Sequence, residues 1–209
     1  MIFQNRKEAG VKLAEALTKY IGENVIVFAL PRGGVELGVE IAKKLNAPLD
    51  LVITKKIGYP LNPEYAIGAV AETGEPLYNQ QERQRVDQAW LKREEERVRV
   101  ELKRRRQEYF GEKNQLDVAG KVAIIVDDGI ATGMTMMSAV KYMKDQGAKS
   151  VVVAIPVTPY DTAQKLSELA DDLVSLQIDR HYRGAVGAYY KDFRQVSDNE
   201  VIALLKESA

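Results

Sequence analysis

The feature that most constrains the fold is a repeated alternation between short aliphatic runs and longer amphipathic segments. The aliphatic runs predict strands at Val25–Leu30, Leu49–Lys55, Val122–Val126, Val151–Val157 and Leu173–Ile178. Helical spacing predicts helices before Gly22, from the turn Pro31–Gly34 to about Leu45, over Met134–Gln146 and after Asp161. The runs do not alternate apolar with polar residues, so both faces of these strands should be covered. The pattern predicts a Rossmann-like α/β fold with a doubly wound, mainly parallel sheet and ligand sites at the carboxyl ends of its strands.

Chain length and charge narrow the possibilities further. At 209 residues the chain suits one α/β domain with a substantial core, whereas two domains would be cramped. We therefore expect a single domain over residues 1–209, with its core at about 22–178. Because 30 Lys and Arg balance 30 Asp and Glu, the chain lacks the basic excess typical of nucleic-acid binders.

The residue inventory excludes several chemistries. The sequence contains no Cys, which rules out disulfides, thiolate metal sites and Cys nucleophiles, and its one His cannot build a multi-His zinc site. The N-terminus turns polar within a few residues, and the apolar runs are only strand-sized. We therefore expect no signal peptide, no membrane contact and a cytoplasmic protein.

Three segments fall outside the strand and helix alternation. Ala66–Ala71 and Pro76–Tyr78 flank a Gly-containing turn and predict a hairpin. Ser197–Glu200 has the pattern of a capping box that opens a last helix through Leu205. The third segment, about residues 80–113, is densely charged.

This charged segment predicts a long inserted helix. Its apolar stripe is narrow and consists of Leu91, Val98, Leu102 and Tyr109. Opposite charges stand four residues apart at Glu95 and Arg99 and at Glu101 and Arg105, as on an exposed helix. The pattern favours a solvated helix packed along one seam, and a lid, a dimer contact or a basic face at Arg104–Arg106 are the alternatives.

The segment from Val122 to Thr135 carries the chemistry. A buried strand ends in two carboxylates, Asp127 and Asp128, and is followed by a turn of small residues and a helix start. Backbone N–H groups in such a turn, together with the positive end of the helix dipole, can hold a phosphate. Thr132 and Thr135 can add hydroxyl donors. Two carboxylates facing the phosphate would repel it, so they should instead address hydroxyls or a cation.

This segment resembles the 5-phosphoribosyl-1-pyrophosphate signature of type I phosphoribosyltransferases, in which two acidic residues precede a small-residue loop with Thr-Gly and a final Thr or Ser. The resemblance implies that the 5-phosphate binds at Gly129, Ile130, Ala131, Thr132, Gly133, Met134 and Thr135. It also implies that Asp127 and Asp128 are the catalytic carboxylates. They would bind the ribose hydroxyls directly or through Mg²⁺, the implied cofactor.

The family also implies a second anion site for the pyrophosphate, after the first core strand. Here that place is held by Pro31, Arg32, Gly33 and Gly34, in which Arg32 offers a planar charged fork. Lys55 and Lys56 are further candidates, with a solvated surface turn as the alternative. Ile57–Tyr65 carries the Gly and Pro expected of a hinged flap.

A small hood over the acceptor is the last implied part. We expect it at about residues 179–196, together with the N-terminal segment, with a strand near Val186–Tyr190. Tyr182, Val186 and Tyr189 are candidate acceptor contacts, because aromatic rings can stack on a flat base. They could equally fill a small satellite core. His181 is more typical of a surface residue.

The resemblance thus implies a Mg²⁺-dependent enzyme that transfers a phosphoribosyl group to a nitrogenous base and releases pyrophosphate. We expect a homo-oligomer, specifically a dimer. A non-catalytic sensor of the same ligand is the alternative from another class, and a related pyrophosphokinase is a third possibility whose ATP-binding elements we do not recognise. One departure concerns the acceptor: where the branch that uses 6-oxopurines has an Asp, this chain has Ala131.

Overall fold

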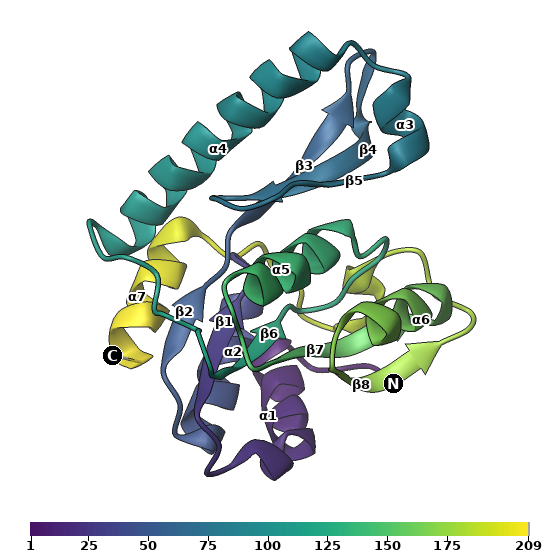
Figure 1. Cartoon of the computed structure of the whole chain (residues 1–209). Helices are drawn as coiled ribbons and strands as arrows, with labels where there is room; N and C mark the ends of the chain where they lie inside the picture. The colour runs from purple at the N-terminus through teal and green to yellow at the C-terminus, as the bar shows by residue number, and fades with distance from the viewer. Residues whose placement is uncertain (209) are drawn as a thin grey trace.

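The structure is a computed structural model that describes residues 1–208. Its centre is a five-stranded parallel sheet in the order β2-β1-β6-β7-β8. The strands are β1 (Val25–Ala29), β2 (Leu49–Leu51), β6 (Val122–Val126), β7 (Ser150–Pro159) and β8 (Asp172–Asp179). The expected doubly wound parallel sheet is confirmed, and helices cover both of its faces (Figure 1).

Alternate residues of each central strand supply two separate cores. In β1, Val25, Val27 and Ala29 belong to the cluster packed against α1 (Arg6–Ala16) and α2 (Gly34–Leu45). Ile26 and Phe28 belong to the cluster formed with α5 (Met134–Asp145) and α6 (Tyr160–Leu169). Both faces of the strand are therefore buried, which explains why the strand is aliphatic throughout.

The single strand expected at Leu49–Lys55 is wrong, because its residues divide between the parallel sheet and a second, smaller sheet. The chain leaves the parallel sheet after β2 and begins β3 (Thr54–Tyr59), which pairs antiparallel with β4 (Asn62–Ala71). The expected hinged loop at Ile57–Tyr65 is the tip of this hairpin, because the two strands pair almost to the turn. β4 also pairs with β5 (Leu77–Tyr78), so the hairpin expected at residues 66–78 is confirmed.

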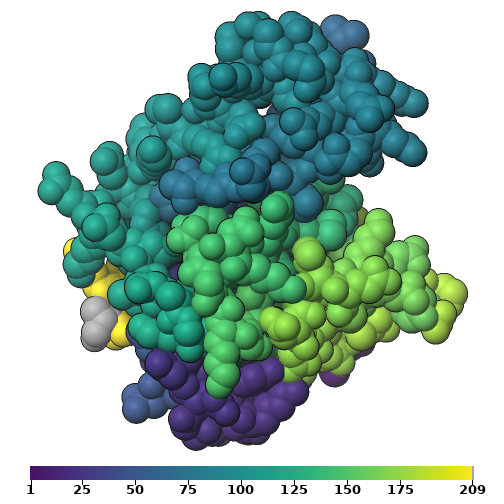
Figure 2. Space-filling view, viewed as in Figure 1, coloured from purple at the N-terminus to yellow at the C-terminus, as the bar shows by residue number. Residues whose placement is uncertain are grey.

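The charged segment forms two helices instead of one, α3 (Gln80–Gln84) and α4 (Gln88–Phe110). The break follows from Asp87, whose side chain accepts the N–H of Ala89 and caps α4. The predicted apolar stripe is confirmed, since Leu91, Val98, Leu102 and Tyr109 are all buried. The helix packs along the small sheet, and in Figure 2 the segment from β3 to α4 forms a distinct upper mass above α5.

Two details of α4 differ from expectation. Arg99 pairs with Glu95 at 2.9 Å as predicted, but Glu101 pairs with Lys55 of β3 at 2.8 Å and not with Arg105. Arg106 is buried against Asp50 and so cannot belong to an exposed basic face.

The chain closes with a loop region, the 3-10 turn η2 (Val186–Tyr189) and α7 (Asp198–Ser208). Ser197 Oγ accepts the N–H of Glu200 at 3.1 Å, which is one half of the predicted capping box. A further 3-10 turn, η1 (Thr18–Tyr20), follows α1. No helix within residues 1–208 combines the length and apolar character needed to cross a membrane.

Candidate functional site

The two predicted anion-binding turns lie side by side, because β1 and β6 are paired in register. Ala29 is opposite Val126, and the N–H of Leu30 donates to the carbonyl of Val126 at 2.9 Å. The turn after β1 therefore meets the loop after β6. A Cβ atom on Gly33 would lie 2.1 Å from Asp128 Oδ2, and one on Gly34 would lie 2.7 Å from the Val126 carbonyl oxygen. Only residues without side chains allow this approach, which explains why both positions are glycine.

The adjacent carboxylates have different surroundings. Asp128 Oδ2 accepts from Arg6 Nε at 2.8 Å in a nearly buried ion pair. Asp127 Oδ1 accepts the N–H of Asp128 at 2.8 Å and has no comparable ion pair among residues 1–208. Burial, followed by the neighbouring negative charge of Asp128, raises the pKa of Asp127 well above its ordinary value.

Arg6 is a site residue that the sequence did not reveal. It is buried at the start of α1, its Nη1 donates to the carbonyl of Arg194 at 2.6 Å, and its guanidinium lies 4.0 Å from the centre of the Phe193 ring. It thereby ties the N-terminus, the loop around residue 193 and Asp128 together. No motif surrounds Arg6, so only the three-dimensional contacts identify it.

Tyr190 was also outside the predicted set of site residues. Its hydroxyl donates to the backbone carbonyl of Asp128 at 2.5 Å, and its ring stacks on Phe193. Burial, with the nearby charge of Asp128, raises the pKa of Tyr190, so the hydroxyl stays protonated and acts as a donor. Phe3 forms an isolated parallel β-bridge with Tyr190. The N-terminal segment therefore supports the tyrosine that holds the backbone carbonyl of Asp128.

The loop Asp127–Thr135 ends at the N-terminus of α5, where the first N–H groups of a helix have no intrahelical acceptor. Gly133 adopts φ +79°, and Thr162 Oγ1 donates to the carbonyl of Ala131 at 2.9 Å. Ala131 and Thr132 are exposed, while Ile130 is buried beneath them. The loop therefore offers exposed groups at the positive end of a helix dipole and can hold an anion.

Carboxylates neutralise two of the predicted pyrophosphate-binding cations. Arg32 Nη1 lies 3.4 Å from Asp198 Oδ1, and Lys55 Nζ lies 2.8 Å from Glu101 Oε1. Lys56 is exposed and, by strand alternation, shares a face of β3 with Thr54, whose Oγ1 donates to the carbonyl of Thr135 at 3.4 Å. That face lies against the start of α5, whereas Lys55 faces α4.

The predicted acceptor contacts separate into two kinds. Tyr189 is fully buried, donates to Asp179 at 2.7 Å and accepts the N–H of Arg183 at 3.0 Å. It therefore holds the turn between these two residues in place. Tyr182 stacks on Tyr189, and Val186 lies against Gly129. The Tyr182 hydroxyl is buried without a hydrogen-bond partner among residues 1–208, and burial raises its pKa.

The expected strand at Val186–Tyr190 is wrong. The N–H groups of Ala188 and Tyr190 donate to the carbonyls of Ala185 and Gly187, three residues earlier, which makes a 3-10 turn. His181 is exposed and donates its backbone N–H to Asp179.

The parallel sheet with two adjoining turns at its carboxyl edge is the arrangement of a phosphoribosyltransferase fold, and the family comparison agrees. The chain belongs to the phosphoribosyl transferase domain family, whose model matches residues 2–192. A Mycobacterium tuberculosis H37Rv protein, provisionally named as a phosphoribosyl transferase, is 38% identical over 206 residues. The match covers 98% of this chain and 46% of that protein, so the chain spans about half the length of this relative.

Solved structures support the same fold. TT1426 from Thermus thermophilus is 40% identical with a TM-score of 0.87, and the match covers 100% of both chains. A hypothetical protein from Neisseria gonorrhoeae, crystallised with bound ppGpp, is 14% identical with a TM-score of 0.53. That match covers 100% of this chain and 96% of the other, and it shows the fold alone.

Proposed function

We propose that this chain transfers the 5-phosphoribosyl group of 5-phosphoribosyl-1-pyrophosphate to a ring nitrogen of a small acceptor and releases pyrophosphate. One observation carries the proposal: the turn that contains Arg32 and Gly33 lies against the carboxylates that precede the phosphate-type loop. A Cβ on Gly33 would come within 2.1 Å of Asp128. The proposed sites for two phosphate groups and for the sugar hydroxyls would thus lie next to one another.

The residues then have separate roles. The N–H groups and hydroxyls of residues 129–135 bind the 5-phosphate. Asp127 and Asp128 bind the ribose 2- and 3-hydroxyls, and their charge favours the cationic sugar. Arg32, with Lys56 or a released Lys55, takes up the pyrophosphate. As the bond from C1 to the pyrophosphate oxygen breaks, a C1–N bond forms, and the acceptor nitrogen loses its proton to solvent.

Magnesium fits this arrangement. Within residues 1–208 no group of three or more His, Asp and Glu side chains could hold a metal alone. Mg²⁺ commonly binds through substrate phosphates with one or two carboxylates. Asp127, partly buried beside Asp128 and with a raised pKa, is a carboxylate that a cation would stabilise. When bound, Mg²⁺ would neutralise charge on the leaving pyrophosphate.

The test is pyrophosphate release from the sugar donor with Mg²⁺ and a panel of purine, pyrimidine and other nitrogenous acceptors. Release should depend on the acceptor and fall at least about 100-fold in Asp128→Asn. Asp145→Asn, at the exposed end of α5, is the matched control and should retain activity. Full activity in both Asp127→Asn and Asp128→Asn would refute the assignment.

A ligand-sensing regulator is the second candidate, because a local similarity favours it. The transcriptional regulator GfcR of Methanothrix thermoacetophila is 48% identical over 42 residues, which is 20% of this chain. A regulator should bind nucleic acid with a salt-dependent affinity that the sugar donor changes. Steady turnover without nucleic-acid binding at low salt would eliminate it. The expected dimer and the cytoplasmic location stay predictions.

A further inference from the structure

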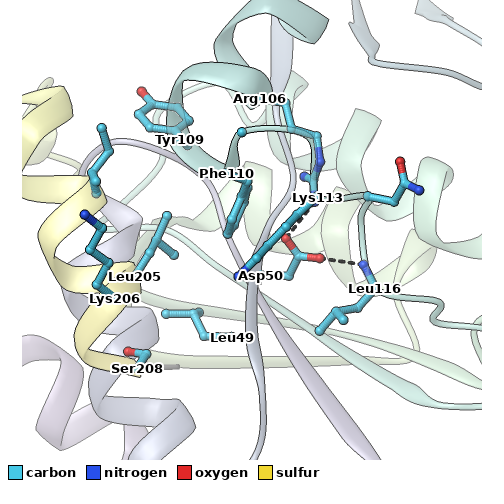
Figure 3. A pocket seen from close by; sticks show the side chains of 13 residues that line it. Leu49, Asp50, Arg106, Tyr109, Phe110, Lys113, Leu116, Leu205, Lys206 and Ser208 are labelled. Atoms are coloured by element: carbon cyan, nitrogen blue, oxygen red, sulfur yellow. Dashed lines mark hydrogen bonds and ion pairs between the residues drawn. The ribbon is translucent and has the colours of Figure 1, made fainter.

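A cavity of about 410 Å³ lies away from the candidate active site, between the end of α4, the following segment, β2 and α7 (Figure 3). This size is within the range of small-molecule sites, which is about 300–1,000 Å³. Its apolar walls come from β2, from α4 with the segment that follows it, and from α7. They consist of Leu49, Phe110, Leu116, Ile202 and Leu205. An apolar ring system would be covered on two sides by these residues.

Charge at the cavity favours an anion. Lys113, after α4, and Lys206, on α7, both line it. The carboxylate among the lining residues, Asp50, is already satisfied. Its Oδ1 accepts from Arg106 Nη2 at 2.9 Å, and its Oδ2 accepts the N–H of Leu116 at 2.7 Å. The two lysines therefore leave the lining with excess positive charge.

Two donors at the cavity are buried and lack partners among residues 1–208. Arg106 is 8% exposed, and its Nε has no hydrogen-bond partner there; the same holds for Ser208 Oγ. The other guanidinium nitrogens of Arg106 face Asp50, the carbonyl of Leu51 and, at 3.8 Å, Glu72. Buried donors nearly always have acceptors, so these two atoms are an unmet hydrogen-bonding demand beside the cavity.

We propose that this cavity is a second ligand site, which takes a small molecule with a flat apolar ring system and one anionic group. The ring packs between Phe110 and Leu205, and the anionic group lies near Lys113 and Lys206. The proposal does not depend on the proposed transferase activity, because none of the predicted active-site residues lines the cavity.

The probe for this site is 1-naphthyl phosphate, which combines two fused rings with a phosphate group, titrated by calorimetry into the whole chain. We expect saturable binding with one site per chain that survives saturating ribose 5-phosphate. The double variant Lys113→Glu/Lys206→Glu should weaken binding at least about tenfold, because two attractive charges become repulsive. Both lysines are exposed, so the variant should fold.

The control is Lys165→Glu, which reverses one lysine charge at an exposed position of α6, away from the cavity, and should bind the probe like the wild type. Leu116→Trp, at a position 44% exposed, fills the cavity without changing charge and should also weaken binding. Absence of binding at millimolar probe would overturn the proposal. Equal binding by the lysine double variant, or displacement of the probe by ribose 5-phosphate, would also overturn it, the latter by placing the probe at the phosphate loop.

Discussion

Asp127 and Asp128 show how two identical side chains acquire different properties from their partners. Arg6 compensates Asp128 at 2.8 Å, whereas Asp127 is partly buried beside a like charge. An ionised Asp127 is therefore unfavourable in the folded protein until a cation or ligand arrives. Groups held in such unfavourable states are typical of functional sites and lower stability.

Asp127→Asn should consequently stabilise the unliganded protein. The native pKa of Asp127 is raised, so the folded state holds a proton that the unfolded state releases above about pH 3.8. This stabilising contribution is complete below that pH and is lost as pH rises toward the native pKa. In metal-free buffer at pH 7.5 the variant should unfold at least about 2 °C higher than the wild type, and near pH 4 the gain should shrink. Thermal scans at both pH values measure this, and a lower midpoint at pH 7.5 would contradict it.

Ala131 bears on the choice of acceptor. It is exposed in the phosphate-type loop, and its carbonyl is occupied by Thr162 Oγ1. A methyl group cannot share a proton with the imidazole nitrogen of a 6-oxopurine, which forgoes about 10²–10⁴-fold of acid-base assistance. We expect hypoxanthine and guanine to be poor acceptors and adenine, a pyrimidine or another nitrogenous ring to be preferred. Wild-type kcat/KM above about 10⁴ M⁻¹s⁻¹ for hypoxanthine or guanine would show this interpretation to be wrong.

At the scale of elements, the predictable parts were those in which local pattern and tertiary contact agree. The strand Val122–Val126 is aliphatic because both its faces are buried, and its boundaries were predicted correctly. The segment Leu49–Lys55 has the same aliphatic start, yet it divides between two sheets. That division depends on which neighbour each half pairs with, β1 or β4, and pairing partners leave no local pattern.

The same reasoning explains what was missed around the candidate site. Arg6 and Tyr190 contact Asp128 from 122 and 62 residues away along the chain. Their roles depend on the fold bringing both ends of the chain together. The turn at Val186–Tyr189 was misjudged for a related reason: its aromatic residues are typical of strands, but its N–H groups bond to nearby carbonyls. The family could be recognised from residues 127–135 because a single continuous segment contains the whole motif.

Gly133 allows a direct test of that loop. It has φ +79°, and a Cβ there would lie 2.6 Å from Thr162 Cγ2, so Gly133→Ala adds both backbone strain and a clash. Gly22 has φ +87° with nothing within 4 Å, so Gly22→Ala adds strain alone. Each should lose about 1–2 kcal/mol of unfolding free energy from strain, and Gly133→Ala should lose more. Only Gly133→Ala should weaken ribose 5-phosphate binding, at least about tenfold by calorimetry. Equal binding by both variants would remove the loop from the phosphate site.

Across the whole molecule, α4 and α7 connect distant parts of the candidate active site. Glu101 of α4 pairs with Lys55, and Tyr109 of α4 donates to Asp198 Oδ1 at 2.7 Å. The same oxygen of Asp198 lies 3.4 Å from Arg32. These contacts, first that of Tyr109 and then that of Arg32, lower the pKa of Asp198, which stays ionised at neutral pH. In the unliganded molecule, Asp198 therefore pairs with Arg32, and Glu101 pairs with Lys55. Both cations are ones that we propose to bind pyrophosphate.

This competition predicts that Asp198→Asn tightens pyrophosphate binding. The Arg32–Asp198 pair is largely exposed, and such pairs contribute about 0.2–1 kcal/mol, so the affinity should rise about 1.4- to 5-fold. Glu200→Gln removes a carboxylate from the same first turn of α7, but Glu200 pairs with Arg194 and not with Arg32, and its effect should be smaller. Arg32→Ala should weaken pyrophosphate more than ribose 5-phosphate and should abolish the gain from Asp198→Asn. Calorimetric titration of the wild type, the three single variants and the double variant Arg32→Ala/Asp198→Asn measures these effects. Equal gains from Asp198→Asn and Glu200→Gln would mean that general surface charge is responsible, and a gain that persists without Arg32 would place the pyrophosphate elsewhere.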